Sequence, residues 1–180
     1  NVMVSPSTGL VGGRTDLRPV AAELDRLVCE TPHLAALPGR FLFVLDDGRG
    51  DLVDRPPDLG LVAVDDSSAQ LRIGSTGWGE TVPIREAAAA LVVLASRFLG
   101  LRGESARAAW HVDEVGIPLA AARPRDPRTD VHQDPLPYGP DHVAAPEGVL
   151  APGLVARLTA SAHDLVVTPW RGVLLTGGAR

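Results

Sequence analysis

The sequence predicts a mixed α/β fold in which helices flank a mixed β-sheet. Three observations lead to this fold class. Short apolar runs of strand-like composition alternate with segments whose apolar residues recur at helical spacing. Hydrophobic side chains make up 45% of the 180 residues, which is enough for one ordinary core. Helices and strands that alternate along a chain pack as layers around such a core.

Four strands are predicted in the first 80 residues, because four short runs are rich in Val, Leu, Ile or Phe and stop at turn-forming residues. They cover residues 1–5, 40–45, 59–64 and 70–73. Pro6 stops the first run, and Arg40 opens the second. Residues 65–68 are expected to join the last two as a hairpin. The glycine-rich stretch 74–79 predicts a loop between a strand and a helix.

Helices are predicted over residues 17–30, 81–100 and 105–115. Asp16 is a candidate N-cap for the first of them. The second has the strongest pattern, because its apolar residues form one stripe that Gly100 ends. Cys29 lies within the first helix, where a buried structural thiol is expected.

A stretch without periodicity divides the chain. It is rich in Pro, Arg, Asp and His, and we expect a linker over residues 122–136. The segments on either side, 1–121 and 137–180, are then separate units. The second contains a short helix and two strands, expected at 152–162, 165–168 and 173–176. This terminal unit has too little apolar surface to stand alone, so we expect it to pack against another part of the protein.

Composition and charge exclude several classes of protein. The formal net charge of -5 argues against non-specific nucleic-acid binding, which usually needs a basic face. No apolar run approaches the length of a membrane span and no signal peptide opens the chain, so a cytoplasmic protein without a membrane partner is expected. The single cysteine forbids an internal disulfide and cannot hold an iron–sulfur cluster through thiolates.

The motifs of several enzyme classes are missing. The five histidines lack the spacing of a helical zinc site, so no metal site is expected. The glycine-rich stretch 74–79 lacks the features of a P-loop or a dinucleotide fingerprint. No serine nucleophile elbow is present, and the absence of lysine excludes Schiff-base chemistry. The carboxylate pairs at 46–47 and 65–66 are explained by turns.

All 17 basic residues are arginines, which can grip carboxylates through two parallel hydrogen bonds. Three of them stand beside strand or loop elements: Arg14, Arg40 and Arg171. A cation fixed at a strand end loses less entropy when it binds an anion than one on a mobile side chain. Ordinary surface arginines are the alternative explanation.

The chain resembles precorrin-3B synthase, the cobalamin-pathway member of the nitrite and sulfite reductase superfamily. The resemblance is carried by three landmarks in order: Asn1-Val2 with Ser5-Pro6, then Leu37-Pro38-Gly39-Arg40-Phe41, then Thr168-Pro169-Trp170-Arg171-Gly172-Val173-Leu174-Leu175. It implies that 1–121 is a nitrite/sulfite reductase-like domain of the sirohaem/iron–sulfur type. It also implies that 137–180 is part of a ferredoxin-like half-domain.

The resemblance implies an activity and a set of binding residues. The parent enzyme would be a monooxygenase that hydroxylates precorrin-3A and forms a lactone in aerobic cobalamin biosynthesis. The family's basic residue in the second landmark helps to bind tetrapyrrole carboxylates, and Arg40 stands there. We therefore expect the tetrapyrrole-binding residues to be Arg40 and Arg171, followed by Asn1, Ser5 and Arg14.

The family's cofactor is a four-iron, four-sulfur cluster, and a haem-type tetrapyrrole is left open. The family's cluster cysteines follow the third landmark, so we expect them in a missing C-terminal part of the same enzyme. A missing N-terminal part is expected before Asn1. We therefore expect this chain alone to be inactive. The electron donor is not identified. Two alternatives remain: a fragment of an assimilatory nitrite or sulfite reductase, which Leu42 disfavours because many reductases have a second lysine there, and a non-catalytic tetrapyrrole-binding module.

Overall fold

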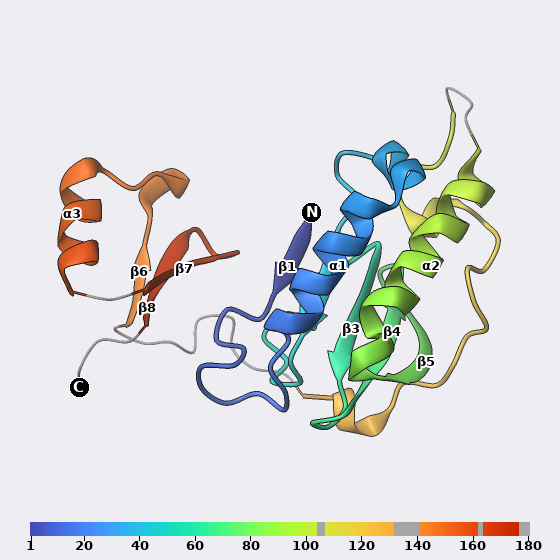
Figure 1. Ribbon diagram of the computed structural model, residues 1–180, viewed down its shortest axis with the longest axis horizontal. Helices are drawn as coiled ribbons and strands as arrows, with labels where there is room; N and C mark the ends of the chain where they lie inside the picture. The colour runs from blue at the N-terminus through green and yellow to red at the C-terminus, as the bar shows by residue number, and fades with distance from the viewer. Residues whose placement is uncertain (104–106, 132–140, 162–163, 177–180) are drawn as a thin grey trace. The chain divides into compact units, whose positions relative to one another are not determined.

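The computed structural model describes residues 1–103, 107–131, 141–161 and 164–176 (Figure 1). The chain divides into two compact units, Asn1–His132 and Gln133–Arg180. The first contains a five-stranded sheet with two α-helices, and the second contains a three-stranded sheet with one α-helix. The predicted mixed α/β class is confirmed at this level. No helix in the described part of the chain is long and apolar enough to cross a membrane.

The sheet of the first unit is mixed, with its strands in sequence order. They are β1 (Val2–Val4), β2 (Phe43–Asp46), β3 (Leu59–Ala63), β4 (Ser68–Ile73) and β5 (Gly77–Pro83). The first three run parallel, and β4 and β5 continue the sheet antiparallel. We call the edge at which β1, β2 and β3 begin the amino edge, and the edge at which they end the carboxyl edge.

Helices α1 (Arg18–Glu30) and α2 (Ile84–Arg102) pack together on one face of this sheet (Figure 1). Side chains alternate between the two faces of a strand, so every second strand residue enters the core below the helices. Phe41, just before β2, joins this core with its ring centroid 5.2 Å from those of Phe43 and Phe98. The remaining fully buried members include Leu17, Leu24, Leu45, Leu59, Leu61 and Leu91.

The opposite face of the sheet is covered by loops. Arg72 of β4 lies on this face, and its guanidinium donates to the carbonyl oxygens of Val53 at 2.9 Å and Arg55 at 3.2 Å. The connection between the parallel strands β2 and β3 therefore crosses the face opposite α1. Because β1, β2 and β3 step in one direction across the sheet, the two parallel crossovers have opposite hands, and one of them departs from the usual right-handed rule.

Part of the expected linker lies along β4 and β5. The Gln70 side chain donates to the Pro124 carbonyl at 2.8 Å and accepts from the Asp126 amide at 2.8 Å. The Arg123 amide donates to the Trp78 carbonyl at 2.9 Å. Residues 122–131 thus belong to the compact first unit, and 132–136 lie outside the described residues.

The second unit has a split β-α-β topology. Its elements are β6 (His142–Ala144), α3 (Pro152–Ser161), β7 (Asp164–Thr168) and β8 (Gly172–Thr176). Strand β8 lies between β6 and β7 and runs antiparallel to both, so β6 and β7 are parallel to each other. A β-strand inserted between two parallel strands that a helix connects is the arrangement of ferredoxin-like folds.

Most predicted elements are present with shifted ends, but four expectations are wrong. The helix expected at 105–115 is not formed: 104–106 lie outside the described residues, and 107–115 contains only a 3-10 turn. Strand β5 begins at Gly77, inside the expected loop 74–79, because the Gly-rich stretch pairs with β4. Arg40 lies in a turn, since β2 begins only at Phe43. Cys29 is exposed.

Two further features were not foreseen. His142 lies on β6, a three-residue strand that is too short to show an alternation of polar and apolar residues. The described residues also contain short 3-10 helices: η1 (Pro32–Ala36), η2 (Val112–Glu114), η3 (Pro127–Thr129) and η5 (Pro146–Gly148).

The aromatic cluster should dominate the stability of the first unit. Phe98 is completely buried, so Phe98→Ala is expected to lower the free energy of unfolding by about 3–5 kcal/mol. Val93→Ala, which removes an exposed side chain from the same helix, is the matched control and should change it by less than about 0.5 kcal/mol. Urea unfolding followed by Trp78 and Trp110 fluorescence, with Trp170 replaced by Phe, would report on the first unit alone. Equal effects of the two substitutions would contradict the packing described above.

Candidate functional site

The structure distributes the five predicted binding residues over three places. Asn1 and Arg40 lie together at the amino edge of the first sheet. Ser5 and Arg14 lie at the carboxyl edge, in one loop network. Arg171 lies in the second unit, in the turn between β7 and β8.

At the amino edge, Asn1 holds a turn that we call the Arg40 turn, residues 38–41. The Asn1 side-chain amide donates to the Gly39 carbonyl at 2.9 Å and to the Phe41 carbonyl at 3.3 Å. The turn is closed by the Phe41 amide, which donates to the Pro38 carbonyl at 2.8 Å. Two of the three sequence landmarks thus meet in one hydrogen-bonded structure.

The Arg40 turn presents its arginine outward. Pro38 and Phe41 on either side are buried, and the Phe41 ring is part of the aromatic cluster. Arg40 itself is exposed, and its guanidinium has no hydrogen bond or ion pair with any described residue. A cation on a fixed backbone with all of its donors available can bind a carboxylate without first breaking an internal contact.

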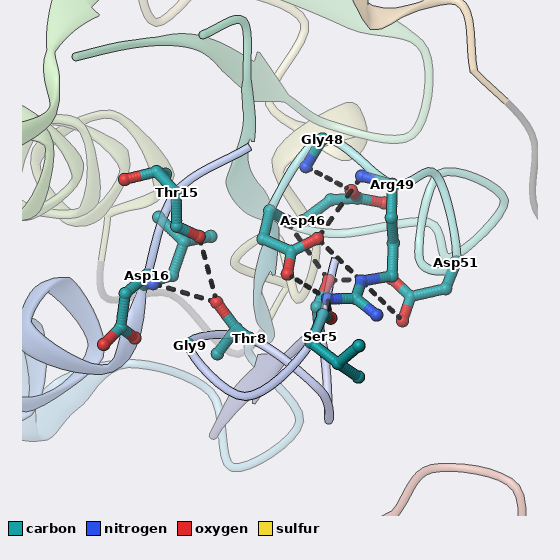
Figure 2. A network of polar contacts seen from close by, with 12 residues as sticks. Ser5, Thr8, Gly9, Thr15, Asp16, Asp46, Gly48, Arg49 and Asp51 are labelled. Atoms are coloured by element: carbon teal, nitrogen blue, oxygen red, sulfur yellow. Dashed lines mark hydrogen bonds and ion pairs between the residues drawn. The ribbon is translucent and has the colours of Figure 1, made fainter. Parts of the chain in front are cut away.

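At the carboxyl edge, Ser5 connects β1 to the loop after β2 (Figure 2). Its hydroxyl donates to an Asp51 carboxylate oxygen at 2.7 Å and accepts from the Asp47 amide at 3.1 Å. Ser5 is only 1% exposed, so its hydroxyl builds the loop and does not face solvent.

Asp46 is the centre of the same loop. Its carboxylate accepts three backbone amides: Gly48 at 2.9 Å, Gly50 at 3.0 Å and Leu52 at 3.0 Å. Burial raises the pKa of Asp46, while these three donors act in the opposite direction. The carboxylate therefore folds the loop around itself, as turn chemistry predicts, although the sequence did not reveal that it is fully buried.

Two arginines complete the loop network. Arg49 grips the Asp47 carboxylate through Nε at 2.9 Å and Nη2 at 2.7 Å, and Nη2 also donates to the Val11 carbonyl at 2.8 Å. Arg14 donates from Nη1 to the Val64 carbonyl at 2.8 Å. Arg14 thus ties the end of β3, which is a structural use that the sequence pattern did not indicate.

A glycine is required where Arg14 crosses this loop. Gly48 has a φ of 86°, in the left-handed region that favours glycine. A Cβ at this position would lie 2.5 Å from Cδ of Arg14 and 2.7 Å from the Ala63 carbonyl oxygen. The close approach of the arginine to the loop thus depends on the missing side chain.

The carboxylates of Asp46, Asp47 and Asp51 approach one another within 4.8 Å and form a group that could hold a metal ion. Each of them already has a protein partner: backbone amides, the Arg49 fork and the Ser5 hydroxyl respectively. The construction of the loop accounts for the cluster, so we base no metal proposal on it.

Thr8 caps helix α1 from a distance in sequence (Figure 2). Its hydroxyl accepts from the Leu17 amide at 2.9 Å and donates to the Thr15 carbonyl at 3.2 Å. The structure has Leu17 at the N-cap, and the expected N-cap Asp16 instead pairs with Arg18 at 2.7 Å. The Asp16 carboxylate also accepts the Arg18 amide at 2.9 Å, so Asp16 caps the first turn of α1 although the assigned N-cap is one residue later.

In the second unit, Arg171 has a left-handed backbone with a φ of 52°. The residue is exposed, and its carbonyl accepts from the Ala145 amide at 2.8 Å. No hydrogen bond or ion pair joins its guanidinium to the described residues. Thr168 and His142 close the other side of this hairpin through a 2.8 Å contact between Nε2 of the histidine and the threonine hydroxyl.

Two surface hollows lie elsewhere on the first unit. One, of about 550 Å³, runs between β5 and residues 123–127, and the other, of about 280 Å³, lies beside Trp78 and residues 116–120. None of the five predicted binding residues lines either hollow. The exposed Arg40 turn therefore lies outside both of these hollows.

The Ser5 hydroxyl should contribute measurably to stability. Ser5→Ala leaves a buried carboxylate oxygen of Asp51 and the Asp47 amide without this partner, and should lower the free energy of unfolding by about 1–3 kcal/mol. Ser75→Ala is the control, because that hydroxyl has no hydrogen bond with a described residue. Urea denaturation of both variants tests this expectation, and an unchanged midpoint for Ser5→Ala would refute it.

The buried Asp46 should make stability depend on pH. Its folded-state pKa is raised, so the contribution of this group is present below the unfolded pKa of about 3.9 and is lost as pH rises through the folded value. The free energy of unfolding of the wild type, relative to that of Asp46→Asn, should therefore decrease as pH rises from 4 towards neutrality. Urea titrations at several pH values measure this difference, and a shift in the opposite direction would show that the three amides outweigh burial.

Comparisons of the chain with protein-family models, with curated proteins and with solved structures found no match. The motifs in the sequence and the geometry of the described residues are thus the basis of the function proposed next.

Proposed function

We propose that this chain is part of a cytoplasmic precorrin-3B synthase-like oxidoreductase, and that it contributes a surface that binds the carboxylates of an anionic tetrapyrrole. The parent enzyme would hydroxylate precorrin-3A with lactone formation. In this proposal, residues 1–121 are the nitrite/sulfite reductase-like domain and residues 137–180 part of a ferredoxin-like half-domain. The three ordered sequence landmarks are the starting point, and the structural features below support it.

The Arg40 turn carries the proposal. Its arginine is the residue that the family resemblance assigns to carboxylate binding, and it is exposed with all guanidinium donors available among the described residues. The turn is fixed by Asn1 and by the buried ring of Phe41. Only Arg55, Arg97 and Arg171 share this lack of a partner among the described arginines. Two of the four unpartnered arginines are therefore residues that the landmarks single out.

The second unit gives independent support. Its split β-α-β topology agrees with the ferredoxin-like half-domain that the resemblance implies for this part of the chain. Arg171 stands at the tip of its hairpin, exposed and unpartnered among the described residues. The first unit, with its mixed sheet and two helices on one face, is compatible with the implied domain at the level of fold class.

The chemistry of the ligand matches the chemistry of the turn. Precorrins carry acetate and propionate arms, which are ionised at neutral pH. A guanidinium can hold one such arm through two parallel hydrogen bonds and stays charged at every physiological pH. In this proposal the chain binds and orients the macrocycle through its periphery. The acid–base and redox groups of the reaction are not assigned to residues of this chain.

A cluster cofactor does not fit this chain. The iron–sulfur cluster of the family takes four thiolates, and Cys29 is the only cysteine of the sequence. The proposal therefore places the cluster ligands, and the electron donor's contact, in other parts of a longer polypeptide. A reading frame that continued past residue 180 without cysteines would contradict the assignment to this enzyme class.

Arg40→Ala should weaken the binding of uroporphyrin, a soluble macrocycle with acetate and propionate arms. Loss of charge-assisted hydrogen bonds to one carboxylate should raise Kd by about 10- to 100-fold. Fluorescence titration of the 180-residue chain at physiological ionic strength measures this change, because low salt would exaggerate non-specific attraction.

Arg85→Ala is the control for Arg40→Ala. It also removes one exposed arginine. The last turn of α2 lies near the Arg40 turn, because Arg102 donates to the Ala36 carbonyl, whereas Arg85 is in the first turn at the opposite end of this helix. Its Kd should stay within about twofold of the wild type. Equal weakening by both substitutions would mean general charge attraction, and no weakening by Arg40→Ala would remove this residue from the binding surface.

A further inference from the structure

A buried carboxylate lies directly behind the Arg40 turn. Asp58 precedes β3, is 3% exposed and accepts the Leu42 amide at 2.9 Å and the Val112 amide at 3.1 Å. Its backbone binds the same partner, because the Asp58 amide donates to the Leu42 carbonyl at 3.0 Å. Its carbonyl accepts the Gly74 amide at 2.8 Å. One residue thus joins three other segments of the chain at the amino edge.

His111 and Asp113 extend this group. The His111 ring has Nε2 at 3.7 Å from an Asp58 oxygen, and its Nδ1 accepts the Asp113 amide at 3.1 Å. The Asp113 carboxylate in turn accepts the Ser75 amide at 3.1 Å. Glu114 also belongs to this segment, and its carboxylate accepts the Trp110 amide. A ring that accepts a hydrogen bond at Nδ1 carries its hydrogen on Nε2, the nitrogen that lies near the Asp58 carboxylate.

We infer that Asp58 is a positioning residue that sets the Arg40 turn for its anion. This inference rests on the proposed function of Arg40. Asn1 fixes the carbonyls of Gly39 and Phe41, and Asp58 fixes both the amide and the carbonyl of Leu42. The arginine thus stands on a turn that is held before and after it. A grip that is already ordered loses less entropy when the anion arrives.

The protonation state of Asp58 matters for this role. Only the ionised carboxylate can accept from both the Leu42 and the Val112 amides without offering a competing donor. Burial raises the pKa of Asp58, and the amides together with His111 counteract that effect. Because the folded-state pKa is raised, the contribution of Asp58 to folding stability is present at low pH and is lost as pH rises through the folded value, so its positioning role rests on the hydrogen-bond geometry alone.

The test is a double-mutant cycle in the 180-residue chain with uroporphyrin as probe. Asp58→Asn replaces one acceptor oxygen by a donor and should weaken binding by about fivefold, the value of one ordinary hydrogen bond. In the Arg40→Ala background the same substitution should have no further effect on Kd. Asp65→Asn, which alters a partly exposed carboxylate in the turn after β3, is the control and should leave Kd unchanged.

Amide exchange gives a readout that does not involve the probe. The Leu42 amide should exchange faster in Asp58→Asn than in the wild type, while the amides of β3 keep their protection. Should Asp58→Asn not fold, Asp58→Glu keeps the charge but displaces the acceptor, and the same weakening of binding is expected with a native circular dichroism spectrum.

The outcomes separate the two proposals. Weaker binding by Arg40→Ala together with unchanged binding by the Asp58 variants would overturn the positioning role and leave the proposed function standing. An equal loss from the Asp58 substitution with and without Arg40 would also overturn it, since the effect would then be general damage. Unchanged binding by Arg40→Ala would overturn the proposed function itself, whatever the Leu42 amide does.

Discussion

Buried carboxylates that accept backbone amides hold both edges of the first sheet. An amide buried without an acceptor costs free energy, and a loop that covers a sheet has many such amides. Asp46 meets this demand at the carboxyl edge by accepting three of them, and Asp58 meets it at the amino edge by joining the starts of β2 and β3 to a remote turn. Asp46 folds the loop to which Ser5 and Arg14 are hydrogen-bonded, and Asp58 binds Leu42, which follows the Arg40 turn.

The arginines divide into those that stabilise the fold and those that remain available. Arg14, Arg49 and Arg72 all donate to carbonyl oxygens of neighbouring loops. In a chain without lysine, the same side chain must serve as loop clamp and as candidate anion grip. Burial and acceptors decide between the two uses: Arg72 is almost fully buried among carbonyls, whereas Arg40 has no acceptor among the described residues.

Sequence patterns were reliable where packing follows a period. The α2 stripe and the apolar strands β2 to β4 were predictable, because one face of each element meets the same core. Sequence patterns failed where tertiary contacts determine the secondary structure. Residues 107–115 have helical composition, yet the Val112 amide is taken by Asp58 and the Trp110 amide by Glu114, so no continuous helix forms. Strand β5 was not predicted, because its glycines indicated a loop.

The candidate site could be predicted only in part for the same reason. The landmarks identified Asn1 and Arg40, and the structure brings these two together. The landmarks could not show that the Ser5 hydroxyl points inward to Asp51, because nothing in its neighbours along the chain indicates that partner. Asp58 and His111 were not found at all. They are 53 residues apart in sequence (111 - 58), and neither belongs to a spacing motif.

The loop between β2 and β3 is bound by an arginine that is synthesised after the loop itself. Val53 and Arg55 present their carbonyls to Arg72, which follows them by 19 and 17 positions. At ribosomal speeds of roughly 5–20 residues per second, this delay lasts about one to four seconds. Until β4 emerges, Val53 and Arg55 lack the guanidinium that binds their carbonyls in the finished sheet, whereas the hydrogen bonds of Asp46 to the preceding part of the same loop need no residue of β4.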